Sequence, residues 1–311
     1  MGFPRHVFIT EVGPRDGLQM ETIQVPTDEK VALIEGLVQA GLPAIQIASF
    51  VHPLRVPQMA DAEEVIRRLP MDASVRYSAL ALNLRGVQRA LETAIPWIEI
   101  SAAASDAHSR ANSGLPMERL MLEVEKMVNA AVKAGRSVRA SIQCTFGCAD
   151  EEHIPDKQIV QLAQRFLEHG VHELILADTT GMGTPLQVKR LLEILLPLAG
   201  GTPVGLHLHD TRGMGLVNVM AGLEMGISRF DSSLGGLGGC PFVAGAAGNI
   251  ATEDTVYLLN ALGIETGIHI PDVAYWSHRM SRMFERTLSG KIYRLHPDDR
   301  GPVCASSAHC R

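Results

Sequence analysis

The chain has 311 residues, of which 46% are hydrophobic and 20% are charged, and its formal net charge is -6. This composition is typical of a globular protein with a hydrophobic core, and it excludes an intrinsically disordered chain. Because the charge is mildly acidic and no block of Lys and Arg occurs, we expect no nucleic-acid partner and no membrane-surface partner. No transmembrane helix is expected either, since the longest uncharged run, 232–252, is rich in glycine and contains Pro241.

The N-terminus and the cysteines favour a cytoplasmic location. No signal-peptide pattern is present, and a run typical of a strand begins at Val7, which leaves no room for a transit peptide. An odd number of cysteines in a long chain favours reduced thiols over a disulfide framework. The five are Cys144, Cys148, Cys240, Cys304 and Cys310.

Short β-branched runs alternate with helical patterns along most of the chain. After the first run, Thr27 is expected as the N-cap of a helix that ends at Gly41. The same order of helix, glycine and strand recurs at Gly135, Gly170 and Gly226. The expected strands are 7–11, 44–49, 75–80, 97–101, 138–143, 173–177, 204–209 and 229–233.

Strands that are separated by helices imply parallel pairing. Eight such units over about 250 residues favour an α/β fold of the (β/α)8 TIM-barrel type over an open doubly wound sheet. No G-x-G-x-x-G motif follows the first strand, which weakens the dinucleotide-binding alternative. We expect residues 1–265 to form the catalytic barrel. Residues 266–311 are expected to add a helix over 273–287 and a tail, packed on the barrel or trailing from it.

Polar side chains collect where the predicted strands end, which is where TIM barrels place their active sites. Arg15 and Asp16 follow the first strand, although Asp-Gly is also a common turn pair, and Asp178 follows the sixth. His207 and His209 are two residues apart on the seventh strand, so both side chains point to one face. Two neighbouring neutral imidazoles indicate a divalent cation such as Zn, Mn, Fe, Co or Mg.

Other residues near these strand ends allow more than one interpretation. Asp210 is expected as a helix N-cap or as a partner of a ligand rather than as a ligand. The glycine-rich stretch 235–239 is either a phosphate cradle or a mobile lid, and Cys240 after it is a candidate acid or redox-sensitive thiol. Cys144 and Cys148 lack a second pair, which is too little for a structural zinc site, so we interpret them as packing residues.

Five stretches together make the sequence similar to a known family. They cover the chain from residue 7 to about residue 265, and the last is the most specific. The sequence resembles the 3-hydroxy-3-methylglutaryl-CoA lyase family of TIM-barrel, metal-dependent acyl-CoA lyases. The stretches are EVGPRDGLQ at 11–19, SFVHPLRVPQMAD at 49–61, LADTTGMGTP at 176–185, HLHDTRGMGLVN at 207–218 and GGLGGCPFVAGAAGNIATEDTVYLL at 235–259.

This resemblance implies roles for individual residues. It implies an enolate-stabilising Arg15, Asp16 or Asp178 as the base, and Cys240 as an acid on a closing loop. It also implies Mg²⁺ or Mn²⁺ as the cofactor, an acyl-CoA as the small-molecule partner, a homodimer and a place in leucine degradation. The implied metal ligands are Asp16, His207, His209 and Asn249, with His207 also counted as catalytic, and the implied substrate-binding residues are Arg15, Gln19, Gln46 and Ser49.

One position departs from the family pattern. Gln46 stands where typical lyases end the second strand with an acidic residue. The expected reaction is cleavage of 3-hydroxy-3-methylglutaryl-CoA to acetyl-CoA and acetoacetate. Gln46 supports two alternatives, a lyase for a related substrate such as citramalyl-CoA and a low-activity paralogue that binds acyl-CoA. A synthase of the isopropylmalate type is disfavoured because few residues follow the barrel, and a hydroxy-keto-acid aldolase is disfavoured by the G-G-C-P loop.

Overall fold

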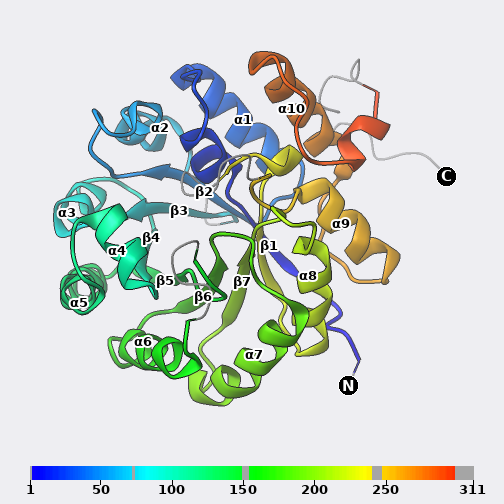
Figure 1. Cartoon of the computed structure of the whole chain (residues 1–311). Helices are drawn as coiled ribbons and strands as arrows, with labels where there is room; N and C mark the ends of the chain where they lie inside the picture. Colours follow the sequence, from blue (N-terminus) through cyan, green and yellow to red (C-terminus); the bar gives the residue numbers. More distant parts are fainter. Residues whose placement is uncertain (1, 72–73, 149–153, 240–246, 298–311) are drawn as a thin grey trace.

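Eight parallel strands form a closed barrel at the centre of the molecule (Figure 1). The computed structural model describes residues 2–71, 74–148, 154–239 and 247–297. The strands are β1 Phe8–Glu11, β2 Ala44–Ser49, β3 Arg76–Ala81, β4 Trp97–Ala103, β5 Ser137–Gln143, β6 Glu173–Asp178, β7 Val204–Leu208 and β8 Arg229–Ser232. Each strand pairs with the next along the chain, and β8 closes the ring on β1. The expected (β/α)8 TIM barrel is confirmed.

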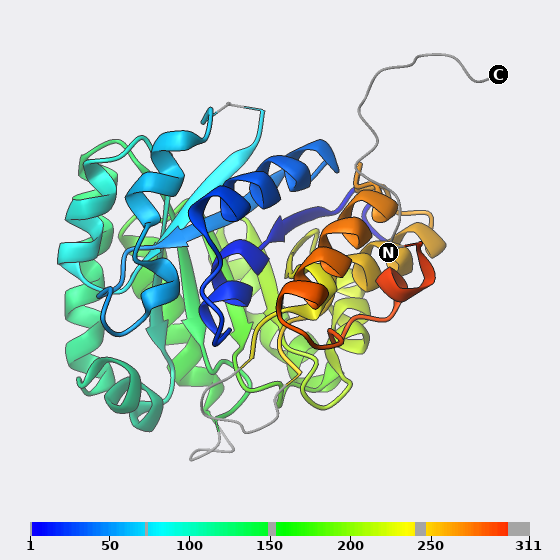
Figure 2. The same ribbon diagram turned by 90° about the horizontal axis from the view of Figure 1, so that it is seen from above.

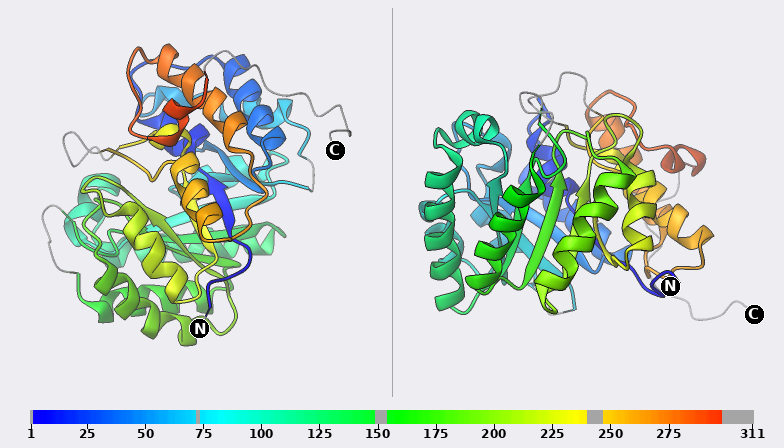
Figure 3. Two further views of the ribbon diagram at one scale, coloured as in Figure 1. Left: turned by 90° about the vertical axis from the view of Figure 1, so that its right-hand side faces the viewer. Right: turned by 60° about the horizontal axis from the view of Figure 1, so that its bottom comes forward.

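Helices surround this barrel on the outside (Figures 1 and 3). They are α1 Thr27–Gln39, α2 Ala62–Arg68, α3 Leu84–Leu91, α4 Asp106–Ser113, α5 Met117–Lys133, α6 Asp156–Glu168, α7 Pro185–Ala199, α8 Gly215–Glu224, α9 Thr252–Ala261 and α10 Ile270–Met283. In α5, for example, the buried residues Leu120, Val124 and Met127 recur every three or four positions, which gives the helix one apolar face toward the strands. None of the described helices is both long enough and apolar enough to cross a lipid bilayer.

Four glycines lie at the turns that the sequence predicts before strands. Gly41, Gly135, Gly170 and Gly226 have φ values of 90°, 75°, 75° and 84°, a region that other residues rarely adopt. At Gly41 a side chain is also excluded by space, because a Cβ atom there would lie 2.3 Å from the backbone oxygen of Gly267. Both the backbone conformation and the lack of space therefore require a glycine at position 41.

Two helix ends differ from the prediction. Thr27 is the first residue of α1 and not its N-cap, which is Pro26. The Thr27 hydroxyl instead donates to Asp61 across a loop, at 2.7 Å. The last helix, α10, begins at Ile270 with a proline in its first turn and ends before Glu285, whose φ of 50° stops it short of the predicted residue 287.

Helix α10 packs against α1 and α9 at the side of the barrel (Figure 2). The indole of Trp276 lies over Gly36 of α1, where a Cβ atom would come within 1.9 Å of the ring nitrogen. Arg279 pairs with Glu29 of α1 at 2.6 Å. The proposed boundary at residue 265 stays a prediction, and α10 shares a buried interface with the first helix of the barrel.

Two buried carboxyl groups hold the loop that follows β8. Glu11, at the end of β1, accepts hydrogen bonds from the backbone N–H of Gly13 at 2.7 Å and of Leu234 at 3.0 Å, and from the Thr252 hydroxyl at 2.6 Å. Glu253 accepts the N–H of Gly235 at 2.9 Å. Burial outweighs these bonds and raises the pKa of Glu11 to about 8 and that of Glu253 to about 7.

The raised pKa of Glu11 predicts a pH dependence of stability. Between pH 4.5 and about 8 the folded chain retains the Glu11 proton that the unfolded chain has released, so rising pH favours unfolding, with a slope of up to about 1.4 kcal/mol per pH unit from this group. Glu11→Gln should remove that contribution. The unfolding free energies of Glu11→Gln and wild type are measured by urea titration at pH 5 to 8.5. We expect the value for Glu11→Gln minus the value for wild type to increase as the pH rises. A difference that is constant with pH would contradict this assignment.

Candidate active site

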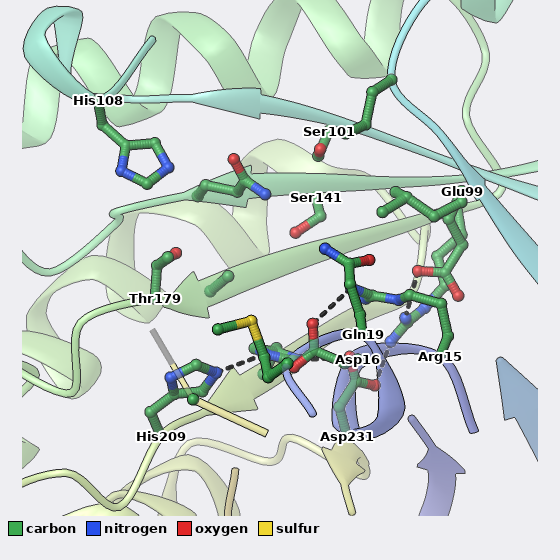
Figure 4. A pocket seen from close by; sticks show the side chains of 18 residues that line it. Arg15, Asp16, Gln19, Glu99, Ser101, His108, Ser141, Thr179, His209 and Asp231 are labelled. Carbon is green, nitrogen blue, oxygen red and sulfur yellow. Dashed lines mark hydrogen bonds and ion pairs between the residues drawn. The ribbon is translucent and has the colours of Figure 1, made fainter. Parts of the chain in front are cut away.

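A cavity of about 140 Å³ opens at the end of the barrel where the strands terminate (Figure 4). Its wall includes Arg15 and Asp16 from the segment after β1, and His207 and His209 from the end of β7. Charged residues of the barrel strands, Glu99, Arg139 and Asp231, also line it. The structure therefore brings together polar residues that are more than two hundred positions apart in the chain.

Arg15 and Asp16 lie on a π-helical turn, Gly13–Gly17, that directly follows β1. The backbone N–H of Asp16 donates to the carbonyl of Val12 at 2.7 Å. The carboxylate of Asp16 accepts Arg15 Nη1 at 2.5 Å through Oδ1 and Asn249 Nδ2 at 2.8 Å through Oδ2. Burial alone would raise the pKa of Asp16, but the charge of Arg15, helped by the hydrogen bond from Asn249, lowers it to about 2. The turn thus presents an ionised carboxylate to the cavity.

His207 and His209 face each other from the end of β7. Their Nε2 atoms are 3.1 Å apart. Burial, together with the neighbouring His207, lowers the pKa of His209 to about 3, so that its imidazole is neutral. Asp16, His207 and His209 each place a ligand atom within 4.8 Å of the others. This is the set that the sequence predicts for a divalent cation.

Two unsatisfied atoms support a cation at this place. Within the described part of the chain, His209 Nδ1 and Asn249 Oδ1 are buried and make no hydrogen bond. Asn249 uses its amide nitrogen instead, on Asp16 and on the carbonyl of Leu237 at 3.0 Å, so its oxygen remains available as an acceptor. Imidazole nitrogens with carboxylate and amide oxygens suit Mg²⁺, Mn²⁺ and related divalent ions. The donor set fits the metal that the resemblance implies.

A buried ionic network positions His207, and the sequence prediction missed it. Asp231 on β8 lies 3.1 Å from His207 Nδ1, which leaves Nε2 to face the cavity. Asp231 is itself paired with Arg139 on β5, which also pairs with Glu99 at 3.1 Å and Glu173 at 3.0 Å. A signal for this network was present, because each of these charged residues stands inside a predicted strand of the barrel.

The substrate-binding candidates lie in different surroundings. Arg15 Nε donates to Gln46 Oε1, which fixes the guanidinium from the side of β2. Among the described residues, Gln46 Nε2, Gln19 Oε1 and Ser49 Oγ are buried without a hydrogen-bond partner. Gln19 lines the cavity, whereas Gln46 and Ser49 are not part of its wall. Gln46 therefore acts on Arg15 in this structure.

Asp178 ends β6 beside the cavity but faces its own loop. Its carboxylate accepts the N–H groups of Met182 at 2.9 Å and Gly183 at 3.1 Å. Burial outweighs these bonds and raises its pKa to about 6. The neighbours Ala177 and Thr179 line the cavity, and Asp178 does not. A catalytic role for Asp178 stays a prediction.

The glycine-rich stretch after β8 is held by other parts of the protein. The N–H of Gly235 binds Glu253, and those of Gly236 and Leu237 bind backbone carbonyls of residues 233 and 234, so these three groups do not form a phosphate cradle. From the far side, Gly290 N donates to Gly235 O at 2.8 Å and the Ser289 hydroxyl to Gly236 O at 3.0 Å. Cys240 lies outside the described residues.

Asn249 and Asp210 are placed by the return of the chain to β7. His209 and Asn249 form an antiparallel bridge, and Asp210 N donates to Gly248 O at 2.9 Å. The Asp210 carboxylate accepts the N–H of Gly215, the first residue of α8, at 2.8 Å, but the N-cap of α8 is Met214, so Asp210 is not the expected N-cap residue. Gly238 approaches so closely that a Cβ atom would lie 2.5 Å from Asn249 Nδ2. The loop after β8 can approach Asn249 this closely only with a glycine there.

A second, larger cavity of about 670 Å³ adjoins the first. The two share Gln19, Leu82, Ser101 and Gln143 in their walls. The larger cavity is also lined by His52 and Arg55 and by several apolar side chains. A long ligand with an anionic end can therefore extend from the polar pocket along this wall.

Comparison with known proteins identifies relatives of the chain. The HMGL-like family model matches residues 6–278. A hydroxymethylglutaryl-CoA lyase of Bacillus subtilis is 41% identical over 270 residues, which is 87% of this chain and 90% of the relative. A mitochondrial hydroxymethylglutaryl-CoA lyase of Bos taurus is 41% identical over 290 residues, 93% of this chain and 89% of the relative.

Solved structures agree with this similarity. The HMG-CoA lyase of Bacillus subtilis superposes with a TM-score of 0.90 at 37% identity, covering 95% of this chain and 99% of that one. The HMG-CoA lyase of Acinetobacter baumannii in complex with coenzyme A and 3-methylmalate gives a TM-score of 0.90 at 35% identity, covering 98% of this chain and 100% of that one. The carboxyl transferase domain of Rhizobium etli pyruvate carboxylase, at 17% identity and a TM-score of 0.67, shares the fold.

Proposed function

The chain belongs to the HMGL-like family, and we propose that it is a metal-dependent carbon–carbon lyase that cleaves 3-hydroxy-3-methylglutaryl-CoA to acetyl-CoA and acetoacetate. The observation that carries the proposal is the convergence of Arg15 with Asp16, His207 and His209 on one cavity. Its relatives of about 40% identity favour this substrate over citramalyl-CoA and over a silent paralogue.

A divalent cation would be held by Asp16, His207, His209 and Asn249. When bound, such a cation acts as a Lewis acid that lowers the pKa of a substrate hydroxyl and fixes its orientation. Neighbouring residues hold these ligand side chains in their orientations. Asp231 orients His207 through Nδ1, and the amide nitrogen of Asn249 steadies the Asp16 carboxylate.

Arg15 would stabilise the enolate of acetyl-CoA as the C2–C3 bond breaks. Its guanidinium is held at one end by Gln46 Oε1 and at another by Asp16 Oδ1, so its direction is set before substrate arrives. A donor that is already aimed at a developing negative charge is worth about 3–4 kcal/mol in the transition state. The reacting thioester oxygen would therefore lie on the Arg15 side of the cavity.

Proton transfer needs a base for the tertiary hydroxyl and an acid for the enolate. We assign the base to Asp16, because it is ionised at neutral pH and lines the cavity. Asp178 is the alternative base, with a pKa of about 6 but with its carboxylate turned to its own loop. Cys240, next to the glycine-rich stretch, is proposed as the acid.

The finer properties of the protein are part of the same proposal. We propose Mg²⁺ or Mn²⁺ as the cation, since the ligands are imidazole nitrogens and hard oxygens. The larger cavity, with Arg55 and His52, would take the coenzyme A arm of the substrate. A cytoplasmic homodimer that serves leucine degradation completes the proposal.

A substrate panel tests the proposed reaction. Metal-free protein is loaded with Mg²⁺ or Mn²⁺ and offered 3-hydroxy-3-methylglutaryl-CoA, citramalyl-CoA and malyl-CoA, and release of acetyl-CoA is followed with identification of the second product. We expect acetoacetate and a preference for 3-hydroxy-3-methylglutaryl-CoA, dependent on the cation. Cleavage of citramalyl-CoA alone, or of none of the three, would refute the proposal.

Gln46→Glu should raise kcat/KM for 3-hydroxy-3-methylglutaryl-CoA several-fold. Gln46 offers Arg15 a neutral oxygen, and a carboxylate at the same place would hold the guanidinium with a charge-assisted bond, which is roughly twice as strong. Gln46→Met, of similar size without an acceptor, is the matched control and should lower activity. The idea fails if Gln46→Glu changes nothing, or if wild type already turns over at about 10 per second.

A further inference from the structure

A second cluster of metal-binding side chains lies at another edge of the same cavity. His108, Cys144 and Cys148 each place a ligand atom within 4.8 Å of the other two. All three are buried. His108 lines the cavity at a distance from His209 (Figure 4). The function proposed above uses none of these three residues.

We propose that His108, Cys144 and Cys148 form a second metal site, selective for a soft or borderline divalent cation of the zinc type. Two thiolates and one imidazole are the donors that zinc prefers, whereas Mg²⁺ and Mn²⁺ prefer oxygen. Sequence spacing alone leaves the two cysteines without a third ligand. The fold supplies it from α4, thirty-six residues before Cys144.

The distances suit a tetrahedral ion. Cys148 Sγ lies 4.0 Å from His108 Nδ1. In a tetrahedral site with zinc–sulfur and zinc–nitrogen bonds of ordinary length, a sulfur and a nitrogen ligand are about 3.6 Å apart. A movement of a few tenths of an ångström would thus close the site on an ion. Three protein ligands leave a fourth position, which is typical of zinc ions that also bind water or a small ligand.

The ligands are held in place by the surrounding chain. Cys144 has a φ of 56°, which is unusual for a residue with a side chain, and its N–H donates to the Thr179 hydroxyl at 2.9 Å. The turn that carries Cys148 is pinned by Thr180, which donates to Gly147 O at 3.0 Å. A strained backbone that is fixed by its neighbours is typical of functional positions.

His108 is oriented from both sides as well. The N-cap Ser105 of α4 accepts the backbone N–H of His108 at 3.0 Å. Burial lowers the pKa of the imidazole, and a hydrogen bond with the Gln143 side chain opposes this without reversing it. The lowered pKa favours the neutral ring that binds metal, and metal-binding histidines commonly have a hydrogen-bond partner of this kind.

Cobalt is a suitable probe, because Co²⁺ bound to thiolate gives a charge-transfer absorption that Co²⁺ on oxygen and nitrogen ligands lacks. Metal-free wild-type protein, kept reduced, is titrated with Co²⁺ and followed by absorption, with bound cobalt measured separately. We expect two ions per chain, one of them giving the thiolate band, and Zn²⁺ but not Mg²⁺ should displace that ion. A wild-type protein without the band would overturn the proposal.

Variants separate this site from the rest of the chain. Cys148→Ser and His108→Gln should each lose the band and one bound ion, with circular dichroism confirming that they fold. His207→Ala should also lose one ion but keep the band. Replacing Cys240, Cys304 and Cys310, which lie outside the described residues, by serine is the matched control and should leave the band intact. A band that persists in Cys148→Ser, or disappears with the other three cysteines, would place the thiolate site elsewhere.

Discussion

His207→Ala is expected to lose the bound divalent cation and the lyase activity together. The substitution removes the nitrogen that faces His209 across 3.1 Å and leaves Asp231 without its partner on the cavity side. Loss of a residue behind a metal ligand commonly lowers metal affinity 10- to 100-fold, so loss of a ligand should cost at least about 100-fold. Metal content after dialysis and acetyl-CoA release from 3-hydroxy-3-methylglutaryl-CoA measure the two effects.

The control for this experiment is a histidine far from the cavity. His169, at the end of α6, lies 3.1 Å from Asn129 and takes no part in the site. His169→Ala should keep both metal and activity. Because the sulfur-containing cluster around His108 is a separate proposal, cation binding in His207→Ala is measured with Mn²⁺, which that cluster should not hold. Stoichiometric Mn²⁺ in His207→Ala would show that the two histidines of β7 are not the ligands.

Arg15→Met is expected to lower kcat by about 10²- to 10³-fold while Mn²⁺ affinity changes much less. Methionine keeps an extended side chain beside Gln46 but cannot meet the negative charge of the enolate. KM should change little, since the guanidinium is aimed at a charge that forms during the reaction. Steady-state kinetics and a Mn²⁺ titration on the same preparation separate these quantities.

Removing Arg15 also affects the neighbouring Asp16, so the pH of the comparison matters. Arg15 also contributes to the low pKa of Asp16, so Arg15→Met should raise that pKa and weaken Mn²⁺ binding toward acidic pH. At pH 8 Asp16 stays ionised in either protein, and the comparison of kcat is made there. Arg67→Met, on the exposed face of α2, serves as the control for removing one positive charge. An equal loss of metal and kcat at pH 8 would assign Arg15 a structural role.

The order of the helices and strands could be predicted from the sequence, because it depends on patterns within short stretches of the chain. The expected strands are short runs between helical patterns, and the turns before β2, β5, β6 and β8 each carry a glycine with positive φ. The expected strand ends lie within two residues of the observed ones. The start of α1 was missed for a non-local reason. Thr27 resembles an N-cap in sequence, yet its hydroxyl binds Asp61, which only the fold brings near.

The sequence could predict the residues of the candidate site that one strand or one turn indicates by itself, but not the contacts between different strands. Asp16 and the two histidines follow from strand ends and alternation. The ionic network behind His207 depends on which strands are neighbours, since Asp231, Arg139 and Glu173 come from β8, β5 and β6. The third residue of the sulfur-containing cluster, His108, escaped for the same reason, because its partners come from the loop after a different strand.

The closing contacts of the barrel also set the order in which the site can be completed during synthesis. Asp16 is made early, but the strand before it pairs with β8, and Asn249 follows later still. Ser289 and Gly290, close to the end of the described chain, then donate hydrogen bonds to the loop that joins β8 to Asn249. A nascent chain can therefore complete the proposed cation site only after residues 249 and 289–290 have been synthesised.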